Sequence, residues 1–202
     1  LDMSLMSVGT NILGYANTKI NNQVFKAIKN GNMSTLNCHE EVLLAEKMLA
    51  INPWADMVKF ARTGGEANSI AVRIARATSG KDKIAICGYH GWHDWYLAAN
   101  LKKKDSLNEH LLPGLNPLGV PKGLKNTIFT FNYNNFEQLK RIVNENKDLA
   151  AIKLEPQRNE LPKNDFLKKV RKLATDKKII LIIDECTSGF RETLGGLHQK
   201  FN

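Results

Sequence analysis

The segment 179–183 is the part of this chain that most constrains its fold. It reads Ile-Ile-Leu-Ile-Ile, five aliphatic residues of which four are β-branched. An unbroken run of this kind predicts a strand of a parallel sheet that is buried on both faces. Ligands of α/β proteins bind at the carboxyl edge of such a sheet. The acidic pair that follows the run, Asp184 and Glu185, therefore marks a candidate functional site.

A fixed carboxylate at Asp184 suits two kinds of partner, a metal-bound nucleotide or the ring nitrogen of a pyridine cofactor. An apolar run before Asp-Glu is also the Walker B pattern of ATPases, which requires an upstream Gly-x-x-x-x-Gly-Lys-Ser/Thr loop. Residues 9–14 have the glycine spacing, but Tyr15 and Ala16 stand where Lys and Ser/Thr are needed. The ATPase interpretation is therefore disfavoured.

Composition narrows the class of protein. The 202 residues are 43% hydrophobic and 24% charged, as in ordinary globular proteins. No apolar run approaches the roughly 20 residues that span a bilayer, so no membrane partner is expected. Three widely spaced cysteines form neither a disulfide framework nor a zinc pattern, which favours the cytoplasm. The net charge is +9, but the lysines are scattered without a nucleic-acid-binding motif, so we expect no nucleic-acid partner.

Helical and strand patterns alternate along the chain, which predicts an α/β fold with a mostly parallel, doubly wound sheet and flanking helices. Residues 100–126 are expected to form an irregular surface excursion. We expect residues 1–55 to be an N-terminal helical segment that leads into a large domain at 56–202. Helices are predicted over residues 17–30, 39–51, 64–78, 135–146 and 165–176, and strands over 56–62, 83–87, 127–131, 149–154 and 179–183.

The turn Thr63-Gly64-Gly65 precedes one of these helices. Small residues let a backbone approach an anion closely, and the amides at a helix start point at it, so a phosphate is a natural occupant. A tight turn in which Thr63 simply caps the helix is an equally good interpretation.

Polar or aromatic groups follow other predicted strands as Asp184 follows its own. Tyr89 comes shortly after the strand 83–87, and Glu155 directly follows the strand 149–154. An aromatic ring in such a position can stack on a planar cofactor, a contact worth about 1 kcal/mol. We expect groups from four strands to meet at one edge of the sheet.

Residues around the same loop could instead bind a metal. His90, His93 and Asp94 are ligand types, but no fourth ligand is evident and the spacing is not a zinc signature, so no metal is expected. Trp92 and Trp95 are three apart and are expected to pack rather than to bind a ligand.

Taken in order, these motifs resemble those of class III aminotransferases, which are pyridoxal 5′-phosphate (PLP) enzymes of fold type I. The resemblance covers nearly the whole chain and is closest to the glutamate-1-semialdehyde aminomutase branch. It implies a PLP-binding large domain, amino transfer between small molecules, and a homodimer. The matching segments are 12–17, 41–45, Thr63-Gly64-Gly65-Glu66-Ala67, Tyr89-His90-Gly91, Glu155-Pro156, Ile183-Asp184-Glu185 and Gly189-Phe190-Arg191.

The resemblance also implies roles for individual residues. The cofactor-binding set would be Thr63, Gly64, Gly65, Tyr89, His90 and Asp184, with Glu155 lining the site near cofactor and substrate. Asp184 would keep the pyridine nitrogen protonated, which makes the ring an electron sink. Tyr89 would stack on the ring, and the turn at residues 63–65 would hold the 5′-phosphate. His90 matches the family motif without a role assigned to it.

Part of the family's site is expected outside this sequence. The family's Schiff-base lysine lies downstream of the element 189–191, and Lys200 comes too early and in the wrong context to be that lysine. A threonine from the partner subunit would contact the phosphate from beyond Asn202. We therefore expect this chain to be a fragment, truncated at its C-terminus and inactive alone.

Two departures from the family pattern bear on the reaction. Gly65 stands where many relatives carry Thr or Ser, and residues 157–162 differ from the aminomutase's mobile loop in length and composition. An aminotransferase and an aminomutase therefore remain equally open. A non-catalytic domain that keeps the fold is the alternative, and a lysine encoded shortly downstream would decide against it.

Overall fold

The computed structural model describes residues 3, 9–31, 35–110, 112–157 and 159–201. The chain divides into two compact units, Leu1–Val58 and Lys59–Asn202. The second unit contains a parallel sheet with helices on both of its faces, and it carries the candidate site. The two units are taken in turn.

The first unit contains the helices α2 (Thr18–Asn30) and α3 (His39–Ile51), as the sequence predicts. The Asn17 side chain caps α2 by accepting a hydrogen bond from the Ile20 amide at 3.2 Å. Although both helices carry many apolar residues, neither has a buried one. Their exposed large apolar side chains are Ile20, Val24, Phe25, Ile28, Val42, Leu43 and Leu44.

The strand predicted over residues 56–62 is wrong. This segment has no regular secondary structure and joins no sheet among the described residues. Its apolar side chains have no core to cover, since Met57 is 80% exposed and Phe60 is 39% exposed. A short apolar run becomes a strand only where a neighbouring strand takes its hydrogen bonds.

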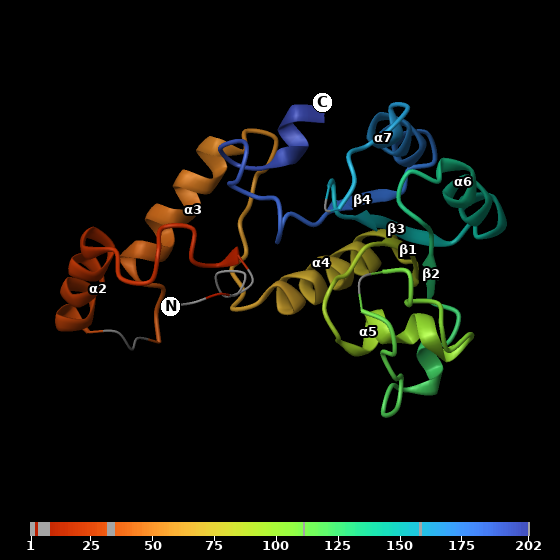
Figure 1. Ribbon diagram of the computed structural model, residues 1–202, viewed down its shortest axis with the longest axis horizontal. Helices are drawn as coiled ribbons and strands as arrows, with labels where there is room; N and C mark the ends of the chain where they lie inside the picture. Colours follow the sequence, from red (N-terminus) through yellow and green to blue (C-terminus); the bar gives the residue numbers. More distant parts are fainter. Residues whose placement is uncertain (1–2, 4–8, 32–34, 111, 158, 202) are drawn as a thin grey trace. The chain divides into compact units, whose positions relative to one another are not determined.

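The second unit is built on a parallel four-stranded sheet in the order β2-β1-β3-β4 (Figure 1). Its strands are β1 (Lys83–Cys87), β2 (Ile128–Thr130), β3 (Leu149–Leu154) and β4 (Ile180–Ile183). Its α-helices are α4 (Gly64–Ser79), α5 (Asp94–Leu97), α6 (Phe136–Glu145) and α7 (Phe166–Asp176), and its 3-10 helices are η1 (Ala98–Leu101), η2 (Lys122–Leu124) and η3 (Leu197–Phe201). The α/β fold predicted from the alternating pattern is confirmed.

Two apolar clusters hold helices against the two faces of this sheet. Val72 of α4 and Tyr96 of α5 pack in the cluster on one face. Leu139 of α6 and Val170 of α7 pack in the cluster on the other. Figure 1 shows α4 and α5 on one side of the strands and α6 and α7 on the other. The doubly wound arrangement follows, because each helix buries its apolar stripe on the sheet.

The strand order places a crevice at the carboxyl edge of the sheet. From β1 the chain moves outward to β2 and then returns to form β3 on the other side of β1, so the order reverses between β1 and β3. Ligands of open α/β sheets bind at such a switch point. Cys87 pairs with Leu154, and Leu154 pairs with Ile183. The residues that follow these strands therefore emerge at one level.

Three details differ from the expectations or refine them. The four residues of β4 are half-buried rather than buried on both faces, because among the described strands β4 has a neighbour on one side only. Trp95 packs in the core as predicted, whereas Trp92 is 70% exposed. Residues 100–110 and 112–126 form turns, short 3-10 segments and irregular stretches, which agrees with the predicted irregular excursion.

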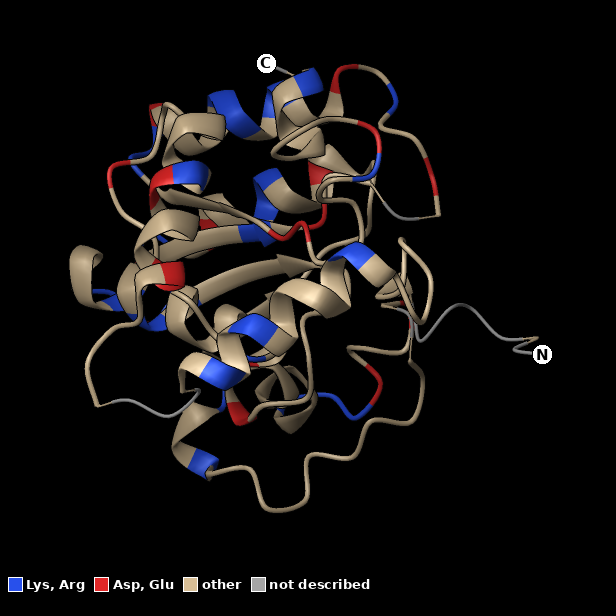
Figure 2. Ribbon diagram, turned by 90° about the vertical axis from the view of Figure 1, so that its left-hand side faces the viewer, with Lys and Arg blue, Asp and Glu red and all other residues tan. Residues whose placement is uncertain are grey.

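Charged residues are spread over the structure. Figure 2 shows basic segments on several separate helices and loops, with acidic segments among them. Many acidic groups pair locally, for example Asp176 with Lys172 one helical turn away in α7 at 3.1 Å. Among the described residues, no helix is both long and apolar enough to cross a membrane.

Candidate active site

The α4 helix begins at the turn that the sequence predicts. Thr63 caps it by accepting a hydrogen bond from the Glu66 amide at 3.1 Å, and the Glu66 carboxylate accepts one from the Arg62 amide at 2.9 Å. The first intrahelical backbone bond runs from Ala67 to Thr63. The amides of Gly64 and Gly65 precede this bond, so they lie where a helix start binds anions. Thr63 is thus a helix cap, and anion binding by the amides of Gly64 and Gly65 stays a prediction.

The turn at residues 63–65 packs tightly against two other loops. A Cβ on Gly64 would lie 2.9 Å from Sγ of Cys186, just after β4. A Cβ on Gly91, in the loop after β1, would lie 3.0 Å from Cα of Gly65. Gly91 also has φ of +98°, where a side chain is strained. These glycines allow the start of α4 to lie close to the loop after β1 and to the loop after β4.

Asp184 lies at the centre of a buried polar network at this edge. Its Oδ2 accepts a hydrogen bond from Nδ2 of Asn68 at 2.8 Å and lies 2.8 Å from Nδ1 of His90. Its Oδ1 accepts a hydrogen bond from the Cys186 amide at 3.0 Å. Nζ of Lys153 lies 3.6 Å from the same Oδ2. The carboxylate is therefore fixed from four directions.

The network keeps Asp184 ionised. Burial alone would raise the pKa of Asp184, but the hydrogen bond from His90 and the Lys153 ammonium outweigh it. The pKa of Asp184 falls well below its usual range as a result. A permanent negative charge thus stands at the end of β4 at every pH near neutral.

His90 supports this carboxylate from a fully buried position. Its second ring nitrogen, Nε2, lies 3.1 Å from the carbonyl oxygen of Cys87, so both nitrogens face acceptors. Burial nevertheless lowers the pKa of His90 to about 4, and the Lys153 charge adds to this effect. The lowered pKa favours a neutral ring at pH 7 whose one proton lies on Nδ1 and is donated to the carboxylate, which leaves Nε2 unprotonated beside the Cys87 carbonyl oxygen. His90 therefore orients Asp184, a role that the sequence motif left unassigned.

Two members of the network were missed by the sequence analysis. Asn68 lies on the second turn of α4, and Lys153 lies inside β3 with its side chain fully buried. Nζ of Lys153 donates a hydrogen bond to Oδ1 of Asn68 at 2.5 Å. A lysine within the apolar strand 149–154 was the available signal, because such a strand rarely carries a charge without a partner.

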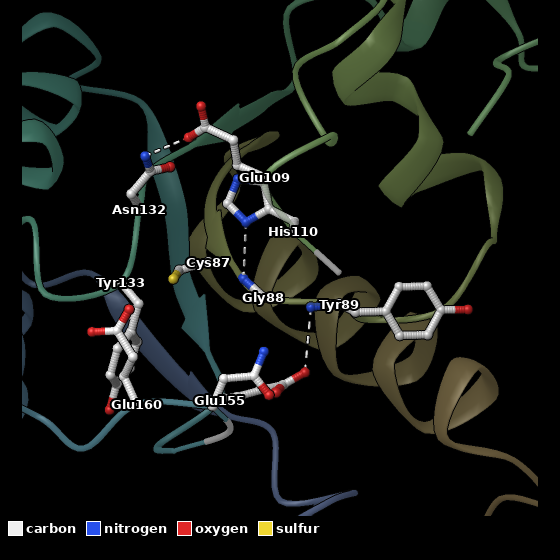
Figure 3. A pocket seen from close by; sticks show the side chains of 10 residues that line it. Cys87, Gly88, Tyr89, Glu109, His110, Asn132, Tyr133, Glu155 and Glu160 are labelled. Carbon is white, nitrogen blue, oxygen red and sulfur yellow. Dashed lines mark hydrogen bonds between the residues drawn. The ribbon is translucent and has the colours of Figure 1, made fainter. Parts of the chain in front are cut away.

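Glu155 and Tyr89 meet across the switch point. The Tyr89 amide donates a hydrogen bond to Oε1 of Glu155 at 3.3 Å. The Tyr89 ring packs edge-on against Tyr96, with a centroid distance of 5.8 Å, and points away from the neighbouring cavity (Figure 3). The predicted stacking surface therefore lies on the other side of the β1 loop from that cavity.

The cavity has a volume of about 280 Å³ and opens beside Glu155 (Figure 3). His110 accepts a hydrogen bond from the Gly88 amide at 3.2 Å on its wall. Cys87 also faces it, and burial, with a contribution from Glu155, raises the pKa of that thiol to about 12. The other lining residues are Tyr89, Glu109, Asn132, Tyr133, Asn159 and Glu160.

Glu185, the other half of the acidic pair, has a separate task. Its Oε1 accepts a hydrogen bond from the His198 amide and contacts Nδ1 of the same residue, both at 2.7 Å. Its Oε2 accepts hydrogen bonds from the Leu197 amide at 2.9 Å and from Oγ of Ser188 at 2.6 Å. Glu185 thus ties η3 to the end of β4 and takes no part in the Asp184 network.

The described residues fit the cofactor that the sequence motifs imply. An ionised carboxylate can hold a protonated pyridine nitrogen, and the glycine cradle at residues 64 and 65 suits a phosphate. The structure brings the turn 63–65, the 88–91 loop, Glu155 and Asp184 to one edge of the sheet. The 88–91 loop, Glu155 and Asp184 follow the strands β1, β3 and β4, and the turn 63–65 begins α4. The sequence analysis expected all four groups to follow strands.

The chain matches known proteins over most of its length. The family model "Aminotransferase class-III" matches residues 1–197. The chain is 35% identical to 3-aminobutyryl-CoA aminotransferase of Cloacimonas acidaminovorans, covering 98% of this chain and 45% of that protein. It is 33% identical to glutamate-1-semialdehyde 2,1-aminomutase of Methanococcoides burtonii, covering 97% and 47%. The chain thus spans about half the length of the curated relatives it matches.

A solved structure supports the same assignment. A transaminase with PLP bound superposes with a TM-score of 0.79 at 25% identity, over 94% of this chain and 45% of the other. The predicted fold, that of the large domain of PLP-dependent transferases of fold type I, is thereby confirmed. The chain belongs to the class III aminotransferase family.

Proposed function

We propose that the full-length protein binds PLP at this edge of the sheet and uses it to move an amino group between carbons. The reaction is that of an aminotransferase or an aminomutase. When bound, this cofactor supplies an electron sink for charge that develops on a substrate carbon. The observation that carries the proposal is the Asp184 carboxylate, which is buried and held ionised at the end of a parallel strand.

Each residue at this edge of the sheet then has a defined role in binding the cofactor. His90 and Asn68 hold one carboxylate oxygen with hydrogen bonds, so the charge cannot rotate away from a ring nitrogen. The amides of Gly64 and Gly65 bind the phosphate at the start of α4. Tyr89 contacts the ring, and Glu155 fixes the backbone of Tyr89 from the adjacent strand. These residues bind and orient the cofactor.

The substrate class follows from the family and from the relatives' names. We propose a small-molecule amino donor and a carbonyl acceptor, handled in the cytoplasm. A β-amino thioester and an α-aminoaldehyde are the two test substrates, because the similar proteins are named for 3-aminobutyryl-CoA and for glutamate-1-semialdehyde.

We further propose that the protein is a homodimer. The support is the first unit, where α2 and α3 have no buried residue although seven of their large apolar side chains are exposed. Such surfaces are costly in water and are commonly covered by a second copy. Light scattering coupled to size-exclusion chromatography measures the mass in solution, and a monomer at micromolar concentration contradicts the proposal.

The function is tested with the protein as its gene encodes it. Calorimetry should detect binding of pyridoxamine 5′-phosphate (PMP), and Asp184→Ala should weaken this binding by about 100-fold or more, as expected for a lost charge-assisted contact. Product analysis with the two test substrates then separates amino transfer from isomerisation. Absence of PMP and PLP binding by the folded wild-type protein refutes the proposal.

A further inference from the structure

Lys153 is a buried lysine whose place in the fold requires a reason. It lies within β3, between Ile152 and Leu154, and its side chain is fully buried. The neighbouring strands β1 and β4 flank β3 on both sides, so no edge of the sheet gives it access to water. Burial of an unpaired ammonium is strongly unfavourable, so its partners must explain its presence.

Its partners lie in the candidate active site. Nζ donates a hydrogen bond to Oδ1 of Asn68 at 2.5 Å and lies 3.6 Å from Oδ2 of Asp184. The amide nitrogen of Asn68 in turn donates to that same carboxylate oxygen at 2.8 Å. Asn68 therefore bridges the ammonium and the carboxylate and orders both.

The other charged and titratable groups near Lys153 are few. Glu155 lies just past the end of β3 and its carboxylate attracts the Lys153 charge, as an ionised Cys186 does. The pKa of Lys153 is lowered overall, because burial outweighs the nearby Asp184 and Glu155 charges, which raise it. The Lys153 charge also lowers the pKa of His90. Within the described part of the chain, Asp184 is the one group that both pairs with Lys153 and, in the proposed function, faces the cofactor.

We propose that Lys153 is a positioning residue which, through Asp184, weakens the hold of that carboxylate on the proton of the cofactor's ring nitrogen. The inference rests on the proposed function, because it requires a ring nitrogen against Asp184. An ammonium behind the carboxylate offsets part of its negative potential at the ring. It also keeps Asp184 ionised and oriented before the cofactor binds. The ring therefore loses its proton at a lower pH than it would against Asp184 alone.

The test measures the ring nitrogen directly. PMP labelled with ¹⁵N in the ring is bound to the full-length protein, and its nitrogen chemical shift is followed against pH. The Lys153→Met variant keeps the length of the side chain and removes the charge. We expect its bound ring to keep the proton to a pH higher by about one unit or more, a tenfold change in proton affinity. The matched control is Lys83→Met on β1, whose ammonium pairs with Asp148, and it should titrate as the wild type does.

The outcomes separate this inference from the proposed function. If the wild type does not bind PMP, the proposed function fails first. If PMP binds and Asp184→Asn lowers the pH of ring deprotonation while Lys153→Met leaves it unchanged, the function stands and the inference is overturned. A lysine that serves stability alone gives this second pattern.

A measurement on the wild type covers the case in which Lys153→Met does not fold. In protein labelled with ¹⁵N-lysine, the buried Nζ should shift when PMP binds. It should shift less with the 1-deaza analogue of PMP, which has no ring nitrogen. Equal shifts with the two ligands overturn the inference.

Discussion

Nδ1 of His90 lies 2.8 Å from Oδ2 of Asp184, although 94 positions separate the two residues in the chain. The same oxygen binds the Asn68 amide and faces Lys153. One buried carboxylate thus joins α4, the loop after β1, the interior of β3 and the end of β4. Because the contacts are shared, a change to one member should alter both stability and the site.

Removal of the Asp184 charge should destabilise the protein by about 3–5 kcal/mol, because it leaves the Lys153 ammonium buried and uncompensated. Asp184→Asn makes this change with little alteration of volume, and urea unfolding measures it. The control is Asp176→Asn, which breaks the exposed pair with Lys172 and should cost less than about 1 kcal/mol.

The double variant Asp184→Asn/Lys153→Met should recover part of that loss. Once the lysine is replaced by an apolar side chain, no unpaired charge remains in the sheet. The free energies of unfolding of the four proteins form a double-mutant cycle. Additive effects would show that Lys153 and Asp184 do not interact.

Stability should fall as the pH drops from about 6.5 to 4. The pKa of His90 is lowered to about 4 by burial, whereas an unfolded histidine titrates near 6.5. In this window the unfolded state binds more protons, so the free energy of unfolding decreases as the pH decreases. The contribution of the His90 ring to the free energy of unfolding is fully present above about pH 6.5 and is lost as the pH falls toward 4. It amounts to at most about 3 kcal/mol.

His90→Gln tests the origin of that slope, since glutamine can still donate to Asp184 but does not titrate. Its unfolding free energy should depend less on pH between 6.5 and 4 than that of the wild type. His39→Gln, at an exposed position of α3, is the matched control and should retain the slope. An unchanged slope in His90→Gln would place the titrating group elsewhere.

The fold was predictable because local patterns and packing agree. The strand at 149–154 and the helix at 39–51 have the bounds that their apolar periodicities predict. The segment 56–62 failed because strand formation depends on a neighbour, which a local pattern does not contain. The run 179–183 was predicted to be buried on both faces because its local pattern likewise does not show how many strands flank it.

The sequence predicts which candidate site residues follow the strands, but it does not predict the network of contacts among them. Asp184 and Glu155 follow strands, so their arrival at one edge follows from a parallel sheet. The contacts of Lys153 and Asn68 depend on the register of α4 over β3, which no spacing in the sequence reveals. The sequence also does not show that Asp184 and Glu185 have different partners. Adjacent side chains leave the backbone in different directions, so the structure is needed to tell their roles apart.

Gly91→Ala should destabilise the protein by about 1–3 kcal/mol and weaken PMP binding. The new methyl group requires a side chain at φ of +98° and would lie 3.0 Å from the Gly65 backbone, which cannot move without opening the helix start. Thermal unfolding and calorimetry measure the two effects. Gly123→Ala is the control, because nothing lies within 4 Å of its Cβ position and its φ is ordinary.

Glu185→Gln should loosen the segment 185–198 without a loss of PMP affinity. The charged carboxylate accepts hydrogen bonds from Ser188 and from the amides of Leu197 and His198, and a neutral amide weakens each. We expect a cost of about 1–3 kcal/mol. Hydrogen exchange at residues 197 and 198 measures the loosening, and Glu192→Gln, on an exposed pair with Lys200, should leave it unchanged.

The three cysteines should differ in their reaction with iodoacetamide. Cys38 and Cys186 are exposed, whereas Cys87 is buried and burial raises its pKa to about 12. The thiolate is the reacting species, so Cys87 should stay unmodified at pH 8 until the protein unfolds. Mass spectrometry of the peptides measures each site.

Bound PMP should protect Cys186 and not Cys38. Sγ of Cys186 lies against the turn at Gly64, where the phosphate is proposed to bind, whereas Cys38 precedes α3 in the other unit. We expect the alkylation rate of Cys186 to fall at least about tenfold at saturating PMP, because the ligand covers the thiol and adds negative charge beside it. Cys38 provides the rate reference in the same sample. Equal rates with and without PMP at Cys186, in protein shown by calorimetry to be saturated, would place the phosphate away from the start of α4.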